Sequence, residues 1–155
     1  MQPLCTWQEV KVLVREIWTA LMLLAGSIMD IKDKTVPAIY LLIAAVGSVV
    51  MTVIYKGELK EMILGLIPGA ALLITGKLSG CMGEADGILL LLLGGMYGLR
   101  DGGELMMYAL LTAAAASFFL IVLKHARKKD TLPFIPFMLA GFMLFELRVY
   151  FFGGG

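Results

Sequence analysis

The chain has 155 residues, of which 60% are hydrophobic, and its mean hydropathy of +0.91 is higher than a water-soluble domain tolerates. The formal net charge is only +1, so the chain has no positive surplus with which to bind nucleic acid. One His and two distant cysteines, Cys5 and Cys81, argue against a zinc cluster, and we expect no metal and no cofactor. The composition indicates an integral membrane protein that contacts a lipid bilayer.

Charged residues and Gly/Pro positions divide the chain into six apolar segments, several of them long enough to cross a bilayer. In chain order they run from Val12 to Met29, Val36 to Tyr55, Met62 to about Lys77, Gly87 to Leu99, Leu105 to Leu123, and Leu132 to Phe152. We therefore predict an all-α membrane protein, a polytopic bundle of about six transmembrane helices. It forms a single domain over residues 1–155, with residues 1–11 as an interfacial lead-in and residues 153–155 as a tail.

Two further patterns concern the arrangement of these segments. The third and fourth segments are rich in glycine, including Gly65 and Gly94, which predicts close helix packing rather than a ligand site. The basic stretch KHARKKD, from Lys124 to Asp130, follows the fifth segment. Because cytoplasmic loops collect Lys and Arg, we place the first, third and fifth loops in the cytoplasm and the protein in the plasma membrane.

Two aspartates stand at the edges of these segments. Asp30 ends the first segment and Asp86 opens the fourth, so six crossings would place both on one face at similar depth. A carboxylate at the edge of a membrane segment is costly enough to be a candidate functional group. Two carboxylates that lie close together share one proton: the ionised one can take a proton from water while the other donates to a peptide carbonyl. The pair predicts aspartic proteolysis.

Other interpretations of these acids remain open at this point. Each aspartate alone is also typical of a helix cap or a flanking charge, as in a scaffold protein. Glu84 is a rival to Asp86 because it lies in the same stretch. A small ion-coupled transporter would use the same two carboxylates, although transporter sites usually lie near the bilayer midplane between internal repeats.

Three stretches of the chain resemble the type IV prepilin peptidases. These are SIMDIKDKTVPAIYLLI at residues 27–43, GCMGEADGILLLLLG at residues 80–94, and LPFIPFMLAG at residues 132–141. They resemble, in order, the first catalytic segment of that family, its GxGD-type loop leading into a Leu-rich helix, and its Pro-Phe-x-Pro-Phe opening of the last span. Taken together in this order, the three motifs cover most of the chain.

The resemblance implies a membrane-embedded aspartic endopeptidase that cleaves the leader peptide of prepilins or pilin-like pseudopilins at the cytoplasmic face. Asp30 and Asp86 would be the catalytic pair, and Gly83 would be the first glycine of the GxGD-type motif. Glu84, Ala85, Asp33 and Pro37 are further candidates for the loop or for substrate contacts.

The chain also departs from the family pattern. Ala85 replaces the second glycine of the motif, Ile88 replaces a lysine, and Ala38 replaces the asparagine that often follows the proline. An inactive homologue is therefore an alternative. The paired CxxC motifs of the longer family members are absent from this sequence, so we expect a short form that lacks the methyltransferase segment.

Overall fold

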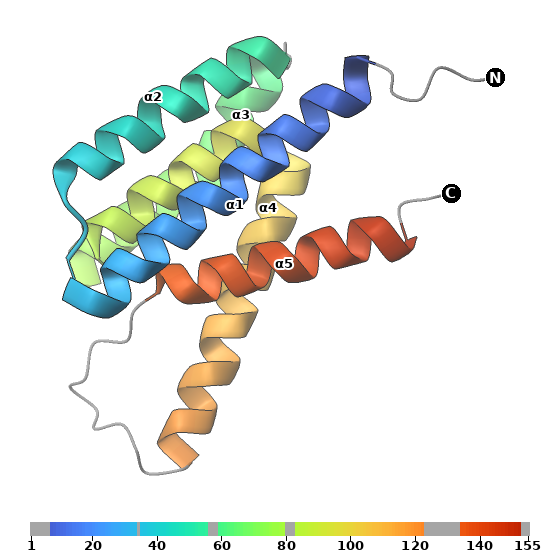
Figure 1. Cartoon of the computed structure of the whole chain (residues 1–155). Coiled ribbons are helices and arrows are strands. Elements are labelled where there is room, and N and C mark those ends of the chain that lie inside the picture. The colour runs from blue at the N-terminus through green and yellow to red at the C-terminus, as the bar shows by residue number, and fades with distance from the viewer. Residues whose placement is uncertain (1–6, 34, 56–58, 80–82, 123–133, 153–155) are drawn as a thin grey trace.

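The computed structural model describes residues 7–33, 35–55, 59–79, 83–122 and 134–152, which form an all-α bundle (Figure 1). Its helices are α1 (Trp7–Asp33), α2 (Ala38–Tyr55), α3 (Leu59–Ser79), α4 (Glu84–Val122) and α5 (Ile135–Phe152). In Figure 1, α1, α2 and α3 lie roughly alongside one another, and α5 begins beside the lower part of α1 and crosses α4. The predicted tail at residues 153–155, both cysteines and the basic stretch at 124–130 lie outside the described residues.

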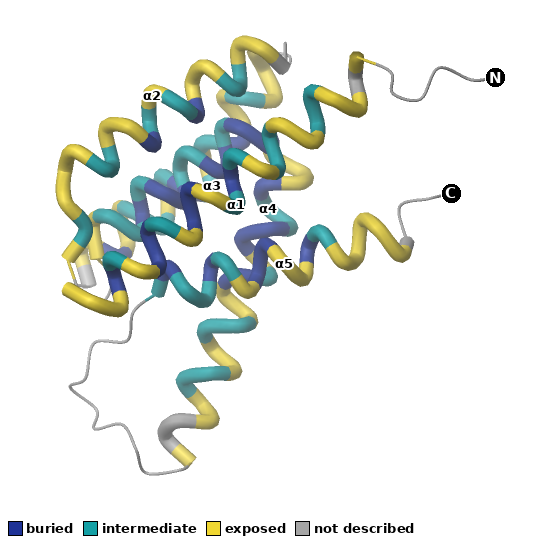
Figure 2. The backbone as a smooth tube through the Cα atoms, viewed as in Figure 1, coloured by how far each residue is buried: buried dark blue, intermediate teal, exposed yellow. Residues whose placement is uncertain are grey.

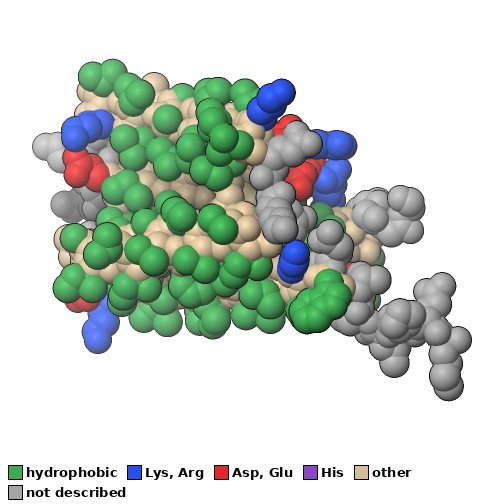
Figure 3. Space-filling model, turned by 90° about the horizontal axis from the view of Figure 1, so that it is seen from above, with side chains coloured by type: hydrophobic (Ala, Val, Ile, Leu, Met, Phe, Trp, Pro, Cys, Tyr) green, Lys and Arg blue, Asp and Glu red, His purple; other side chains and the backbone are tan. Residues whose placement is uncertain are grey.

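The exterior of the bundle is apolar, as expected for a membrane protein. Figure 3 shows hydrophobic side chains over the middle of one face, with charged side chains gathered at its two ends. Three of the described helices have the length and apolar character to cross a membrane, over Glu9–Asp33, Leu59–Leu78 and Glu84–Phe119. The all-α membrane class is therefore confirmed, whereas the predicted count of about six transmembrane helices is not supported.

The count differs partly because α4 contains two of the predicted segments. At Gly98 the backbone has φ 78° and ψ −175°, a positive-φ extended conformation that is essentially restricted to glycine and that interrupts the helix. In a straight helix, Gly94 and Gly102 would be about 12 Å apart. A Cβ atom at Gly102 would instead lie 3.0 Å from the Cα atom of Gly94. The two segments of α4 therefore bend sharply at Gly98, and they run in different directions in Figure 1.

Helix α1 begins earlier and ends later than its sequence predicted. Residues 7–11, expected as an interfacial lead-in, are helical and continuous with the rest of α1, whereas residues 1–6 are not described. The predicted segment stopped before Asp30, but α1 runs on to Asp33. Charged residues near both ends of the apolar stretch therefore extend the helix instead of terminating it, because Glu, Lys and Arg are good helix formers.

The core lies where one face of α1 meets α4 and α5, which Figure 2 shows as the dark blue stretches. The buried residues of α1 recur every three or four positions, as a helix requires, at Thr19, Met22, Leu23, Gly26 and Ser27. The two hydroxyl groups on this face donate to carbonyl oxygens one turn earlier in the same helix, with O···O distances of 2.9 and 2.7 Å. The face is thus closed to water without leaving these polar groups unpaired.

Helices α3 and α4 share the most extensive contact in the bundle, and glycines set their separation. A Cβ atom added at Gly65 would overlap the carbonyl oxygen of Gly94, and one added at Gly69 would lie 2.5 Å from the Cα atom of Leu91. The predicted role of these glycines in packing is confirmed. Such close backbone approach provides van der Waals contact where no hydrophobic effect draws helices together in lipid.

This packing predicts how two glycines of α4 respond to the same substitution. Gly94→Ala should lower the free energy of unfolding by about 1–3 kcal/mol, because its methyl group has no room beside the backbone of Gly65. Gly103→Ala is the matched control, since a Cβ atom there meets nothing within 4 Å. It should leave stability unchanged or raise it slightly. Unfolding of both variants in detergent measures the difference, and equal stabilities would contradict the close contact.

Candidate functional site

Asp30 lies on the buried face of α1. It stands two helical turns after Leu23 and one turn after Gly26 and Ser27, so it continues the inward stripe, and only 9% of its surface is exposed. Its Oδ2 atom accepts a buried hydrogen bond from the backbone N–H of Ile135, the first residue of α5, at 3.2 Å. The carboxylate is therefore held between the last turn of α1 and the first turn of α5.

Asp86 occupies the first turn of α4 and faces the same interior. The positions three, four, seven and eleven residues later are buried, namely Leu89, Leu90, Leu93 and Tyr97. The carboxylate accepts a hydrogen bond from the backbone N–H of Gly83, which precedes the helix, and it interacts electrostatically with Asp30. A side chain in the first turn that bonds back to the residue before the helix is a known capping arrangement. Asp86 thus caps α4 and lies close enough to Asp30 for the two carboxylates to interact electrostatically.

The structure separates Glu84 from this pair. Glu84 is exposed, and its carboxylate forms an ion pair with Lys77 at the end of α3, with an O···N distance of 3.0 Å. It precedes Asp86 by two residues, which turns its side chain about 200° around the helix axis. Glu84 therefore pairs with Lys77 in an exposed position, and Asp86 is the acid of α4 that interacts with Asp30.

The other candidate residues lie around the pair without joining it. Asp33 is exposed at the end of α1, and its carbonyl oxygen accepts from the hydroxyl of Thr35 at 3.4 Å. Pro37 is exposed just before α2, where its carbonyl oxygen accepts the N–H groups of Tyr40 and Leu41 at 3.0 and 3.3 Å. Pro37 therefore starts α2, as the sequence suggested, and Asp33 has no described contact with either aspartate.

Gly83 and Ala85 border the acid of α4. A Cβ atom placed at Gly83 would lie 3.1 Å from Oδ2 of Asp86, which is closer than nearly all real Cβ contacts. A side chain at Gly83 would therefore crowd the carboxylate. Ala85, the departure from the family's second glycine, is half-buried within the first turn of α4. It lies in ordinary helix, so a residue with a Cβ atom fits there.

A small cavity of about 190 Å³ opens beside this site between the end of α3 and the start of α4. Leu72, Leu73 and Ile88 form its apolar walls, and Lys77 and Glu84 lie at its rim together with Gly83. Gly83 lines the cavity and also lies beside the carboxylate of Asp86, which is not itself among the residues that line the cavity.

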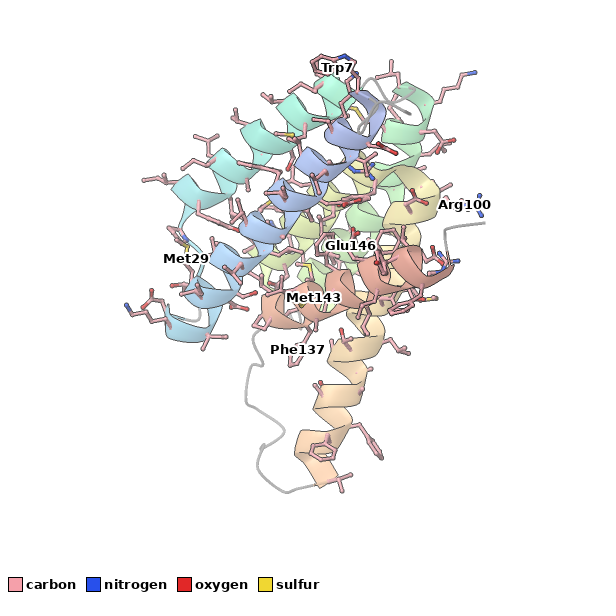
Figure 4. All side chains as sticks on the ribbon, turned by 45° about the vertical axis from the view of Figure 1, so that its right-hand side comes forward. Trp7, Met29, Arg100, Phe137, Met143 and Glu146 are labelled. Carbon is pink, nitrogen blue, oxygen red and sulfur yellow. The ribbon has the colours of Figure 1, made fainter. Side chains whose placement is uncertain are left out.

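The site lies at one end of the bundle. In Figure 4, Met29, the neighbour of Asp30, and Phe137, in the first turn of α5, lie toward one end, and Trp7 and Arg100 lie toward the other. Within the described ranges, no group of three or more His, Cys, Asp or Glu side chains is arranged to hold a metal ion. The arrangement thus consists of two carboxylates, two backbone donors and an adjoining apolar cavity.

The sequence analysis missed Ile135, whose backbone N–H contacts Asp30. The stretch LPFIPFMLAG was noticed only as the opening of the last segment. One signal was present: Pro136 lacks an N–H, so the preceding residue supplies the first free donor of a helix that starts here. Its acceptor lies 105 residues earlier in the chain and is not visible from local sequence.

Comparison with known protein families bears on this arrangement. The model of the type IV leader peptidase family matches residues 17–124, more than half of the chain. The chain belongs to the type IV leader peptidase family. Both aspartates and the Gly83–Asp86 stretch fall within the matched residues, whereas α5 lies beyond them. No curated protein and no solved structure matches the chain significantly.

The contact between Asp30 and Ile135 predicts different stabilities for two substitutions of Asp30. Asp30→Asn and Asp30→Ala both remove the negative charge, but only alanine also removes the acceptor for a buried N–H. A buried donor without a partner costs about 1–3 kcal/mol. Asp30→Ala should therefore unfold in detergent with a free energy about 1–3 kcal/mol below that of Asp30→Asn. Equal stabilities would show that the N–H of Ile135 does not need this acceptor.

Proposed function

We propose that this member of the leader peptidase family is a membrane aspartic endopeptidase that cleaves the leaders of prepilins or pilin-like pseudopilins at the cytoplasmic face. One observation carries the proposal. Asp30 and Asp86, which lie far apart in the sequence, both face the interior of one end of the bundle and interact electrostatically. Two carboxylates that served only as helix caps would not be expected to lie close together, because like charges at close range repel each other.

The chemistry follows from a pair that shares one proton. The ionised carboxylate accepts a proton from a water molecule, and the water oxygen attacks the carbonyl carbon of the scissile peptide bond. The protonated carboxylate donates to the carbonyl oxygen, which gives a gem-diol intermediate. Collapse of the diol breaks the C–N bond, and the leaving nitrogen receives a proton from the pair. These reaction steps involve no covalent enzyme intermediate and no cofactor.

The location of the pair suits a substrate that enters from water and remains partly in lipid. The pair lies toward one end of the bundle, which is the side from which water and an extended leader would approach (Figure 4). The cavity between α3 and α4 has apolar walls, so it offers space for an apolar side chain of a leader on the same end of the bundle. The apolar helix of a prepilin can stay in the bilayer against the hydrophobic exterior of the bundle.

The experiment that tests this function is co-expression with tagged prepilin-like substrates, with cleavage scored as a size shift on a gel. The wild-type chain should cleave at least one leader. Asp30→Asn and Asp86→Asn should each reduce cleavage at least about 100-fold, because each removes a group that transfers a proton. Asp101→Asn is the matched control, since Asp101 is an exposed aspartate next to Arg100, at the other end of the bundle.

Two outcomes would contradict the proposal. If the wild type cleaves no leader of a varied set while the chain is present in the membrane, the inactive homologue becomes the better interpretation. If Glu84→Gln abolishes cleavage and Asp86→Asn does not, the second carboxylate is Glu84.

The shared proton also predicts the pH dependence of cleavage. The rate should fall at low pH, where both carboxylates are protonated and neither can accept a proton from water. It should fall again at higher pH, where the shared proton is lost and neither can donate. The two limbs belong to the pair and not to either acid alone. Measuring kcat/KM against pH checks this, and a flat profile with chemistry rate-limiting would count against a shared proton.

A further inference from the structure

The first turn of α5 leaves one backbone donor that its own helix does not satisfy. Pro136 has no N–H. The N–H groups of Phe137 and Met138 donate to the carbonyl oxygen of Phe134, at 3.0 and 3.1 Å. The N–H of Ile135 remains, and it donates to Oδ2 of Asp30 at 3.2 Å. The start of α5 therefore depends on the same carboxylate that we place in the reaction.

Other contacts fix the position of this turn against α4. The hydroxyl of Thr112 lies 2.9 Å from the carbonyl oxygen of Phe137, and it is also within reach of two carbonyls of its own helix. One turn further along α5, a Cβ atom added at Gly141 would lie 2.5 Å from the backbone nitrogen of Ala109. The side chain of Ile135 is fully buried. The first turn of α5 is thus packed tightly enough to fix where the N–H of Ile135 points.

We propose that the N-terminus of α5 positions Asp30 for the proteolytic reaction, with the backbone N–H of Ile135 as the positioning group and Thr112 as its support. This inference rests on the proposed function. A hydrogen bond to Oδ2 fixes the rotation of the carboxylate and leaves Oδ1 without a described partner, available to the water molecule or to Asp86. A displacement of about 1 Å in such a group costs up to about 100-fold in rate.

A positioning role differs in its consequences from an ordinary helix cap. Loss of a cap alone lowers the stability of the protein and leaves turnover by the folded fraction unchanged. Loss of a positioning contact lowers kcat of fully folded protein and leaves KM nearly unchanged, because substrate binding does not involve Asp30 until the chemical step. Measurements well below the unfolding temperature therefore separate the two roles.

The decisive comparison is Ile135→Pro against Ile135→Ala, in purified protein whose wild type cleaves a leader peptide. Proline removes the N–H and is tolerated at the first position of a helix, whereas alanine keeps the N–H. Both lose the buried Ile side chain. We expect kcat of Ile135→Pro to be at least about tenfold below that of Ile135→Ala, with KM within about twofold. We also expect a displaced pH profile. Equal kcat values for the two folded variants would overturn the proposal.

Thr112 provides a second test of the same arrangement. Thr112→Val keeps the shape of the side chain and removes the hydroxyl, so kcat should fall about threefold or more with KM unchanged. Thr112→Ser keeps the hydroxyl and should restore wild-type kcat. If valine and serine behave alike, Thr112 does not support the turn.

A third measurement does not depend on activity. In thermal unfolding, the difference in midpoint between Ile135→Pro and Ile135→Ala should largely vanish in an Asp30→Ala background, because the acceptor is already gone. A difference that persists there would show that the N–H of Ile135 does not act through Asp30. If the wild type cleaves nothing, the proposed function fails. The comparison of unfolding midpoints in the two backgrounds still decides whether the N–H of Ile135 bonds to the carboxylate of Asp30.

Discussion

A carboxylate among apolar helices needs partners inside the protein, because lipid offers none, and this requirement organises the end of the bundle where Asp30 lies. The same requirement applies to the unpaired N–H groups at the start of a helix. Here one contact satisfies both: Ile135 opens α5 and donates to Asp30. The ends of α1 and α5 are therefore joined by a bond between a main-chain group and an acid. Each of the two helices thus helps to hold the other in place.

The opposite acid depends on a different kind of constraint. Asp86 is carried by the first turn of α4, and the position of α4 is set by contact of its backbone with that of α3 at Gly65 and Gly94. Backbone atoms have no rotamers through which to adjust, so this contact allows little variation in helix separation. Each carboxylate accepts a backbone hydrogen bond, and the helix that carries Asp86 is in addition located by backbone packing against α3. The distance between them is determined by how α1, α4 and α5 pack together.

Part of this arrangement was predicted from the sequence, which placed Asp30 at the end of one apolar segment and Asp86 at the start of another. The spacing from Leu23 to Asp30, and from Asp86 to Tyr97, places each acid on the apolar face of its helix. The glycines of α3 and α4 likewise indicated close packing from the sequence alone. These features follow from residues within a few turns of one another.

The features that sequence reasoning missed depend on contacts between distant residues or on backbone geometry. The partner of Ile135 lies in another helix, and no local pattern reveals it. The sharp bend at Gly98 joins two predicted segments into α4, because one glycine with positive φ replaces the loop that was expected between them.

The bend at Gly98 also bears on how the chain enters the membrane. The two segments of α4 have no loop between them, and they approach each other within one turn of the bend. Two apolar segments joined in this way can leave the aqueous phase together as one helical hairpin, so that the segment that carries Asp86 enters the bilayer beside an apolar neighbour.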